Sequence, residues 1–229
     1  MSSTYEIEIK SLLGEKKEAE RVKNLILVKG GILSANNKQL NHYFLLNDVS
    51  LFKKNLLSYI KDDQRSLFEN ITTNGKNFSV RTREIFLPNQ PKNKVILVIK
   101  ASVDDNTSSN GVSRMEFEQQ VDMTLEELDA ILISSKLEYQ SKWSREREEY
   151  KVDNITVCLD RNAGYGYLAE FEMITEDKDK IPEIKTRLTS IMDDFGVVEL
   201  QQDRLERMFA YYNANWQDYY GTDNVFNIK

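Results

Sequence analysis

Hydrophobic positions follow two periods along the chain, and each period predicts a different kind of element. Stretches that alternate apolar and polar residues, or that form a short apolar run as in 94–101, read as strands over 4–10, 39–46, 77–87, 94–101, 112–121, 137–150, 155–160 and 165–174. Apolar residues recur at helical spacing over 15–29, 48–63, 125–132, 182–195 and 203–212, and the polar stretch 104–110 reads as a loop. Many antiparallel strands with a few helices predict an α+β fold.

Composition excludes several classes of protein. Hydrophobic residues are 40% of the chain and charged residues 30%, which is typical of a globular protein. The longest apolar run, Val95–Ile99, is far shorter than the roughly 20 residues of a membrane span. A net charge of −6 argues against general nucleic-acid binding. The single cysteine, Cys158, rules out a disulfide framework and a Cys-rich zinc site, so we expect a cytoplasmic protein with no membrane partner.

Charges recur at a spacing of two on five predicted strands, which places them on one face of each strand. A solvent-exposed face is the ordinary explanation for one such pair. Here, however, the pairs segregate by sign, and the like charges of each pair repel one another unless a counter-ion is present. The doublets are Glu6 and Glu8 with Lys10, Arg81 and Arg83, Glu116 and Glu118, Arg145 and Arg147, and Glu170 and Glu172, with Lys100 and Asp160 on further strands.

The two signs suit two different ligands. Carboxylates bind hard divalent cations, and arginines grip phosphate with two hydrogen bonds. The seven acids and six bases nearly cancel, so they could meet across a wet cavity. A closed antiparallel barrel provides such a cavity, and amphipathic helices would cover its apolar outside. We therefore expect all five doublets to point into one central cavity.

The same residues resemble a known family. Glu6-Ile-Glu-Ile-Lys10 is similar to the ExExK signature of the CYTH superfamily, the triphosphate tunnel metalloenzymes. The later markers follow in the family's order: Arg81 and Arg83, Lys100, Glu116 and Glu118, Arg145-x-Arg147-x-x-Tyr150, Asp160, and Gly166-x-x-x-Glu170-x-Glu172. The resemblance implies an eight-stranded antiparallel tunnel with helices outside, in which the bases hold a triphosphate and the acids bind Mg²⁺ or Mn²⁺.

Two features depart from that pattern. Arg145 stands where the family usually has lysine, which keeps the charge but replaces a point charge with a planar fork. Residues 48–76 form an insertion, and an aromatic tail follows the family's core. We therefore predict a tunnel domain over 1–200 and a C-terminal helix and tail over 201–229 packed on or beside it.

The predicted activity is metal-dependent hydrolysis of an inorganic, organic or nucleoside triphosphate. The expected substrate-binding residues are Lys10, Arg81, Arg83, Lys100, Arg145 and Arg147. The expected metal ligands are Glu6, Glu8, Glu116, Glu118, Asp160, Glu170 and Glu172, and the expected catalytic residues are Glu6, Glu8, Lys10 and Glu170. An adenylate cyclase that makes cyclic AMP and pyrophosphate, and a non-catalytic triphosphate-binding module, stay open as alternatives, as does a homodimer.

Four further features are expected to be structural. His42, the single histidine, is interpreted as a structural or substrate-edge residue rather than a general base. Cys158 is expected to be a buried, inert thiol, and Trp143 to pack rather than to stack on a nucleobase. The cluster Glu146, Glu148 and Glu149 is expected to face solvent.

Overall fold

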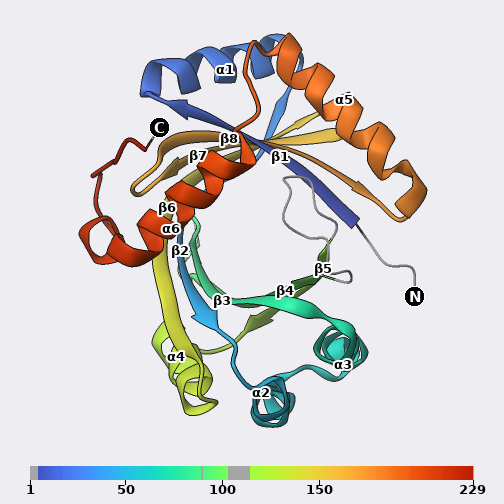
Figure 1. Ribbon diagram of the computed structural model, residues 1–229, viewed down its shortest axis with the longest axis vertical. Coiled ribbons are helices and arrows are strands. Elements are labelled where there is room, and N and C mark those ends of the chain that lie inside the picture. Colours follow the sequence, from blue (N-terminus) through green and yellow to red (C-terminus); the bar gives the residue numbers. More distant parts are fainter. Residues whose placement is uncertain (1–4, 89, 103–113, 229) are drawn as a thin grey trace. The chain divides into compact units, whose positions relative to one another are not determined.

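The computed structural model describes residues 5–88, 90–102 and 114–228. Within them the chain forms eight strands (Figure 1). They are β1 (Tyr5–Gly14), β2 (Ile32–Leu45), β3 (Lys76–Phe86), β4 (Lys94–Ser102), β5 (Arg114–Val121), β6 (Glu138–Val152), β7 (Ile155–Asn162) and β8 (Gly166–Thr175). The α-helices are α1 (Lys16–Val28), α2 (Val49–Leu56), α3 (Arg65–Asn74), α4 (Leu125–Ser134), α5 (Ile181–Asp194) and α6 (Gln202–Asn215). The polar segment 104–110 lies outside the described residues.

The strands follow the hydrogen-bonded order β1-β8-β7-β6-β2-β3-β4-β5. This confirms the predicted α+β class and the eight-stranded antiparallel sheet with helices. The order begins at β1 and ends at β5, and within the described residues no ladder joins these two strands. The structure therefore does not show a barrel that is closed by hydrogen bonds.

The chain forms two compact units. Among the described residues, unit 1 contains 5–38 and 144–228, and unit 2 contains 39–88, 90–102 and 114–143. The long strands β2 and β6 run through both units, and each unit has a hydrophobic core of its own. Each core lies between one face of the unit's strands and the unit's helices.

The core of unit 1 lies between its strands and the helices α1 and α5. Ile7 and Ile9, which alternate with the charges of β1, are 0% and 4% exposed and pack with Val22 of α1 and Leu188 of α5. Phe171 of β8 lies in the same cluster. The prediction that helices cover the apolar positions of these strands is therefore correct in unit 1.

The insertion supplies much of the core of unit 2. Helices α2 and α3 both belong to it, and with α4 they cover the apolar face of β3, β4 and β5. Phe68 of α3 is fully buried and meets Phe117 of β5 edge to face, with 5.5 Å between ring centroids. Helix α3 was not predicted, because its apolar residues span only two turns and its C-terminal half contains two threonines, which favour helix weakly. The predicted helix over 48–63 ends at Leu56.

The helix ends show why the other helices lie where the sequence predicts them. Thr124 and Glu127 form a reciprocal capping box at the start of α4, with nitrogen–oxygen distances of 2.8 and 3.2 Å. Pro182 lies in the first turn of α5, where its missing N–H costs nothing. None of the helices in the described part of the chain is both long and apolar enough to cross a membrane.

The C-terminal tail packs against the turn between β7 and β8. Gly164 in this turn exchanges backbone hydrogen bonds of 2.8 and 2.9 Å with Phe226 and Asn224. Phe226 also contacts the ring of Tyr165, at 5.3 Å between centroids. Gly164 has a φ of +80°, and a Cβ there would lie 2.7 Å from the ring of Tyr212 in α6, so only glycine fits both the turn and the tail. The tail is thus an integral part of unit 1.

Candidate functional site

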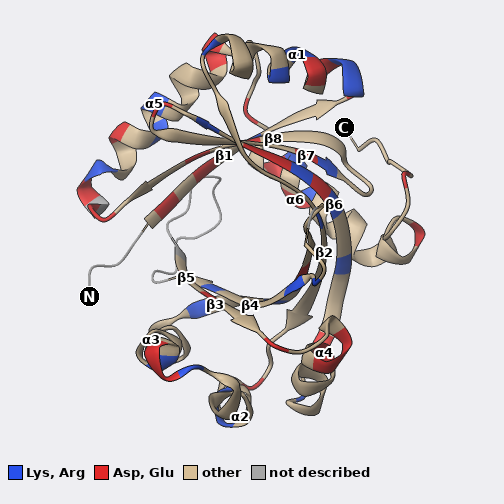
Figure 2. Ribbon diagram, turned by 180° about the vertical axis from the view of Figure 1, so that it is seen from behind, with Lys and Arg blue, Asp and Glu red and all other residues tan. Residues whose placement is uncertain are grey.

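Strand register in unit 1 brings charged residues together on the face that the helices leave uncovered (Figure 2). Glu8 lies opposite Glu172, Lys10 lies opposite Glu170, and Arg147 lies opposite Asp160. We call the following eight residues the charged face of unit 1: Glu6, Glu8, Lys10, Arg145, Arg147, Asp160, Glu170 and Glu172. This face carries five acids and three bases, a formal charge of −2.

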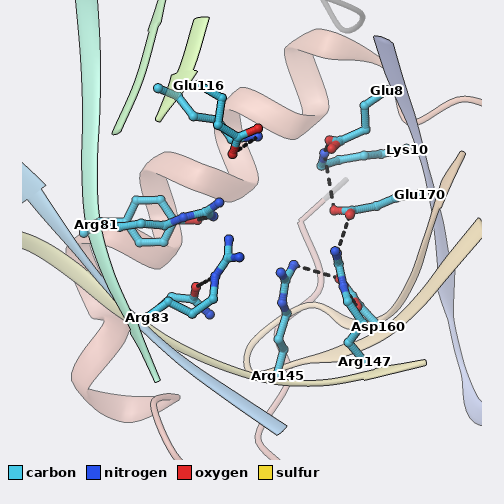
Figure 3. Close-up of polar contacts among 12 residues, drawn as sticks. Glu8, Lys10, Arg81, Arg83, Glu116, Arg145, Arg147, Asp160 and Glu170 are labelled. Carbon is cyan, nitrogen blue, oxygen red and sulfur yellow. Dashed lines mark hydrogen bonds and ion pairs between the residues drawn. The ribbon is translucent and has the colours of Figure 1, made fainter. Parts of the chain in front are cut away.

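Asp160 holds both arginines of this face (Figure 3). Arg147 donates to it with two parallel hydrogen bonds, Nε to Oδ1 at 2.7 Å and Nη2 to Oδ2 at 2.6 Å. Arg145 Nη1 donates to Oδ2 at 3.0 Å. The Asp160 side chain is 0% exposed and both arginine side chains are 14% exposed. Such a bidentate, buried contact fixes the plane of the Arg147 guanidinium, and the single hydrogen bond restrains one end of the Arg145 guanidinium.

A chain of alternating charges continues from Arg147 towards β1. Arg147 Nη2 also donates to Glu170, whose other carboxylate oxygen lies 3.4 Å from Lys10 Nζ. Lys10 in turn pairs with Glu8. Burial would raise the pKa of the Glu170 carboxyl, but Arg147, Lys10 and Arg145 hold that pKa well below its usual range. Glu170 is therefore ionised at neutral pH and suited to accept hydrogen bonds or bind a cation.

The carboxylates of β1 and β8 fit a divalent cation better than the rest of this face does. Glu8 and Glu172 stand directly opposite each other, and like charges at such positions repel unless a cation lies between them. The Glu8 side chain is 26% exposed, so a cation can reach it. In the described part of the chain no three acidic, histidine or cysteine side chains converge in a preformed metal site. Such a site would therefore require the carboxylates to move together on binding.

The charged face of unit 2 consists of Arg81, Arg83, Lys100, Glu116 and Glu118. Register places Arg81 and Glu118 on either side of Val98, and Lys100 directly opposite Glu116. Two ion pairs join its members, Arg83 to Glu118 at 3.2 Å and Lys100 to Glu116 at 3.1 Å. With three bases and two acids, this face has a formal charge of +1. It is the basic counterpart of the acidic face in unit 1.

Neutral groups on β2 orient the arginines of unit 2. Arg81 Nη1 donates to the Tyr43 hydroxyl at 2.8 Å, and Arg83 Nε donates to Asn41 Oδ1 at 3.0 Å. Burial would lower the pKa of Arg81, but Tyr43 and the nearby Glu118 and Glu116 keep it above its usual value. Arg81 Nε is buried and finds no hydrogen-bond acceptor in the described part of the chain. Arg81 is therefore charged and has a donor left for an anionic ligand.

Every predicted site residue lies on one of these two faces, eight in unit 1 and five in unit 2. That all of them share one cavity, and the role assigned to each, stay predictions.

Glu149 was not among the expected site residues, although it lies opposite Cys158 at the same spacing on β6 as the two arginines. Its side chain is 29% exposed, accepts a 2.8 Å hydrogen bond from Ser34 and pairs with Lys151 at 3.2 Å. Its spacing of two from Arg147 was the available signal. Asn41 and Tyr43 were also missed, although they flank His42 at the same alternating spacing. Adjacent charges and isolated polar residues are harder to assign than doublets, because they do not reveal which face is buried.

His42 is part of a buried network on the helix side of unit 2. Its Nδ1 lies 2.6 Å from Asp129 Oδ2, and Thr82 and Tyr139 donate to the same carboxylate at 2.6 and 2.7 Å. The network joins β2, β3 and β6 to α4, which supports the structural interpretation of His42.

Cys158 and Trp143 are both buried. Burial raises the pKa of the Cys158 thiol to about 12, so the thiol is inert at neutral pH. The indole N–H of Trp143 donates to Ser141 at 3.0 Å. Both residues therefore have the structural character that the sequence predicts.

Comparisons with known proteins agree with this arrangement. The CYTH domain profile matches residues 68–204, which is more than half of the chain. None of the curated proteins compared with the sequence matches it. Among solved structures, the PH1819 protein from Pyrococcus horikoshii has a TM-score of 0.61 at 20% identity, covering 86% of this chain and 94% of its own.

A second solved structure, described as a "putative adenylate cyclase" from Vibrio parahaemolyticus, has a TM-score of 0.60 at 16% identity. The match covers 90% of this chain and 98% of its own. At these identities the two structures show a common fold. The family match over more than half of the sequence agrees with this fold and with the order of the charged doublets. The chain belongs to the CYTH domain family.

Proposed function

We propose that this protein hydrolyses a triphosphate with the help of Mg²⁺ or Mn²⁺, and that the two charged faces divide the work. The observation that carries the proposal is the segregation of charge between the units. The charged face of unit 2 has three bases and two acids, whereas that of unit 1 has five acids and three bases. The membership in the CYTH family supports a triphosphate-related activity in general.

The arginines of unit 2 are the main phosphate-binding groups in this proposal. Arg81 is held by a neutral hydroxyl rather than by a carboxylate, so its full charge is available to an anion. The guanidinium of Arg81 also lies 5.5 Å from the Tyr43 ring centroid, which helps to fix its plane. A guanidinium with a fixed plane binds phosphate oxygens bidentately. Arg83 and Lys100, which pair with Glu118 and Glu116, add charge around it.

The acids of β1 and β8 are the proposed cation ligands. Glu6, Glu8, Glu170 and Glu172 would hold the ion, and a bound divalent cation would neutralise phosphate charge and lower the pKa of a coordinated water molecule. Lys10 lies between Glu8 and Glu170 and restrains both carboxylates. The lowered pKa of Glu170 keeps this residue ionised, so it serves as an acceptor and not as a general acid. In phosphoryl transfer, fixed charges of this kind provide most of the rate enhancement.

A product assay tests the proposal and separates it from its alternatives. The protein is incubated with inorganic triphosphate, thiamine triphosphate or ATP, each with Mg²⁺, Mn²⁺ or EDTA. We expect metal-dependent release of orthophosphate from at least one substrate and none with EDTA. Cyclic AMP with pyrophosphate would identify a cyclase instead. Tight triphosphate binding without any product would support a binding module.

A further inference from the structure

Both carboxylate oxygens of Asp160 accept hydrogen bonds from arginines, whereas Glu8 and Glu170 pair with Lys10. We infer that Asp160 is a positioning residue that aims Arg145 and Arg147 at the triphosphate, and that it is not a ligand of the divalent cation. The inference rests on the proposed function, because it assigns one acid of that site to the phosphate side.

Guanidinium groups already occupy the carboxylate of Asp160. Both oxygens of Asp160 accept hydrogen bonds from guanidinium groups, three bonds in total, between 2.6 and 3.0 Å. A carboxylate offers about four lone-pair sites, so little capacity is left for a cation. A cation at Asp160 would also have to displace two positive groups from a side chain that is 0% exposed. Breaking a buried pair in this way leaves charges without compensation.

The surroundings of Glu8 differ from those of Asp160. Glu8 pairs with the Lys10 ammonium, a compact point charge on a flexible chain. Its side chain is 26% exposed, and its cross-strand neighbour is the like-charged Glu172. A cation would relieve repulsion between Glu8 and Glu172, whereas at Asp160 it would meet the two guanidinium groups. Cation binding is therefore favoured at β1 and β8 and disfavoured at Asp160.

The contacts with Asp160 leave part of the Arg147 guanidinium available to a phosphate group. The contacts of Arg147 use Nε and Nη2, and Nη1 has none within the described residues. Arg145 contacts Asp160 through Nη1, at the end of its fork. Because two parallel hydrogen bonds to Asp160 fix the guanidinium plane of Arg147, the N–H groups at its Nη1 keep defined directions. This pre-organisation lowers the entropy cost of binding a phosphate group.

A cation titration separates positioning from ligation. Free Mn²⁺ is measured by electron paramagnetic resonance as it is added to the parent protein, Asp160→Asn and the matched control Glu172→Gln. Both substitutions replace a carboxylate with an amide on the same face. We expect Asp160→Asn to bind Mn²⁺ within about twofold of the parent, and Glu172→Gln to bind it at least tenfold more weakly. A loss in Asp160→Asn as large as that in Glu172→Gln would overturn the inference.

A second measurement asks whether Asp160 acts through its arginines. Inorganic triphosphate is titrated in EDTA by calorimetry into the parent, Asp160→Asn, Arg147→Gln and the double variant. We expect Asp160→Asn to weaken binding about tenfold in the parent and to have a smaller effect in Arg147→Gln, because only Arg145 is then left for Asp160 to position. Equal losses in both backgrounds would show that Asp160 does not act through Arg147.

Folding and the underlying function need separate controls. If Asp160→Asn does not fold, Arg145→Lys takes its place, since it keeps the charge but offers Asp160 an ammonium instead of a fork. We expect weaker triphosphate binding and unchanged Mn²⁺ affinity; tighter Mn²⁺ binding would show that Asp160 is a ligand restrained by Arg145. A parent protein that binds neither Mn²⁺ nor triphosphate would contradict the proposed function itself. Binding of both by the parent, with Mn²⁺ binding lost in Asp160→Asn, would contradict the inference alone.

Discussion

The two units orient their arginines in different ways. In unit 1, Arg145 and Arg147 share the buried carboxylate of Asp160, so part of their charge is cancelled before any ligand arrives. In unit 2, the tyrosine hydroxyl that holds Arg81 fixes its direction without cancelling its charge, whereas Arg83 contacts both the Asn41 carbonyl and the carboxylate of Glu118. Arginines can therefore be oriented by a carboxylate, which reduces their net charge, or by a neutral group, which leaves it unchanged.

The largest effect is expected from removing the arginine with neutral partners. Arg81→Ala should weaken inorganic triphosphate binding by about 2–5 kcal/mol, because a desolvated charge that meets the anion is lost. Calorimetric titration in EDTA measures it. Arg65→Ala, which removes an exposed arginine on α3, is the control and should bind like the parent. Unchanged affinity in Arg81→Ala would remove unit 2 from the phosphate site.

The spacing of the charges that leads to this prediction can be read from the sequence, but the ion pairs that these charges form cannot. A spacing of two fixes which face of a strand a charge lies on, so Glu8 and Arg83 could be assigned to charged faces. It does not fix register between strands, so the contact between Arg147 and Asp160 could not be foreseen. Tyr43 was overlooked because a single polar aromatic residue in a strand gives no periodic signal. Helix α3 was overlooked because its apolar stripe is short.

The next effect concerns turnover rather than binding. Glu170→Gln keeps shape but removes a charge from the proposed cation ligands, and turnover should fall by about two orders of magnitude or more. Triphosphate binding in EDTA should survive, because the arginines of unit 2 remain. Orthophosphate release at saturating substrate measures the change. Normal turnover with added Mg²⁺ or Mn²⁺ would show that Glu170 has no part in catalysis.

A smaller effect is expected from the neutral partner itself. Tyr43→Phe removes the hydroxyl that accepts from Arg81 and should weaken triphosphate binding by about 1.5–3 kcal/mol, the range for a hydrogen bond to a charged group. Tyr59→Phe is a matched control, because Tyr59 is exposed and lies outside both faces. Equal affinities for Tyr43→Phe and the parent would mean that Arg81 needs no partner on β2.

The smallest effect is a pH dependence of stability in unit 1. The pKa of Glu170 is lowered in the folded protein, so its ion pairs stabilise the fold above the unfolded-state pKa of about 4.3. This contribution is lost as the pH falls below that value towards the folded-state pKa, by at most about 1.4 kcal/mol per pH unit. Urea unfolding of the parent and of Glu170→Gln between pH 6 and pH 3 measures it. A free energy of unfolding that falls equally in both proteins would contradict the shift.

The division of work between the two faces has one direct test. Inorganic triphosphate is titrated in EDTA into Arg81→Ala and Glu172→Gln side by side, with the fold of each checked by circular dichroism. The account predicts that Arg81→Ala loses most of its affinity, whereas Glu172→Gln binds at least as tightly as the parent because it has lost a negative charge. Equal losses in the two variants would contradict the assignment of phosphate to unit 2 and of the cation to unit 1.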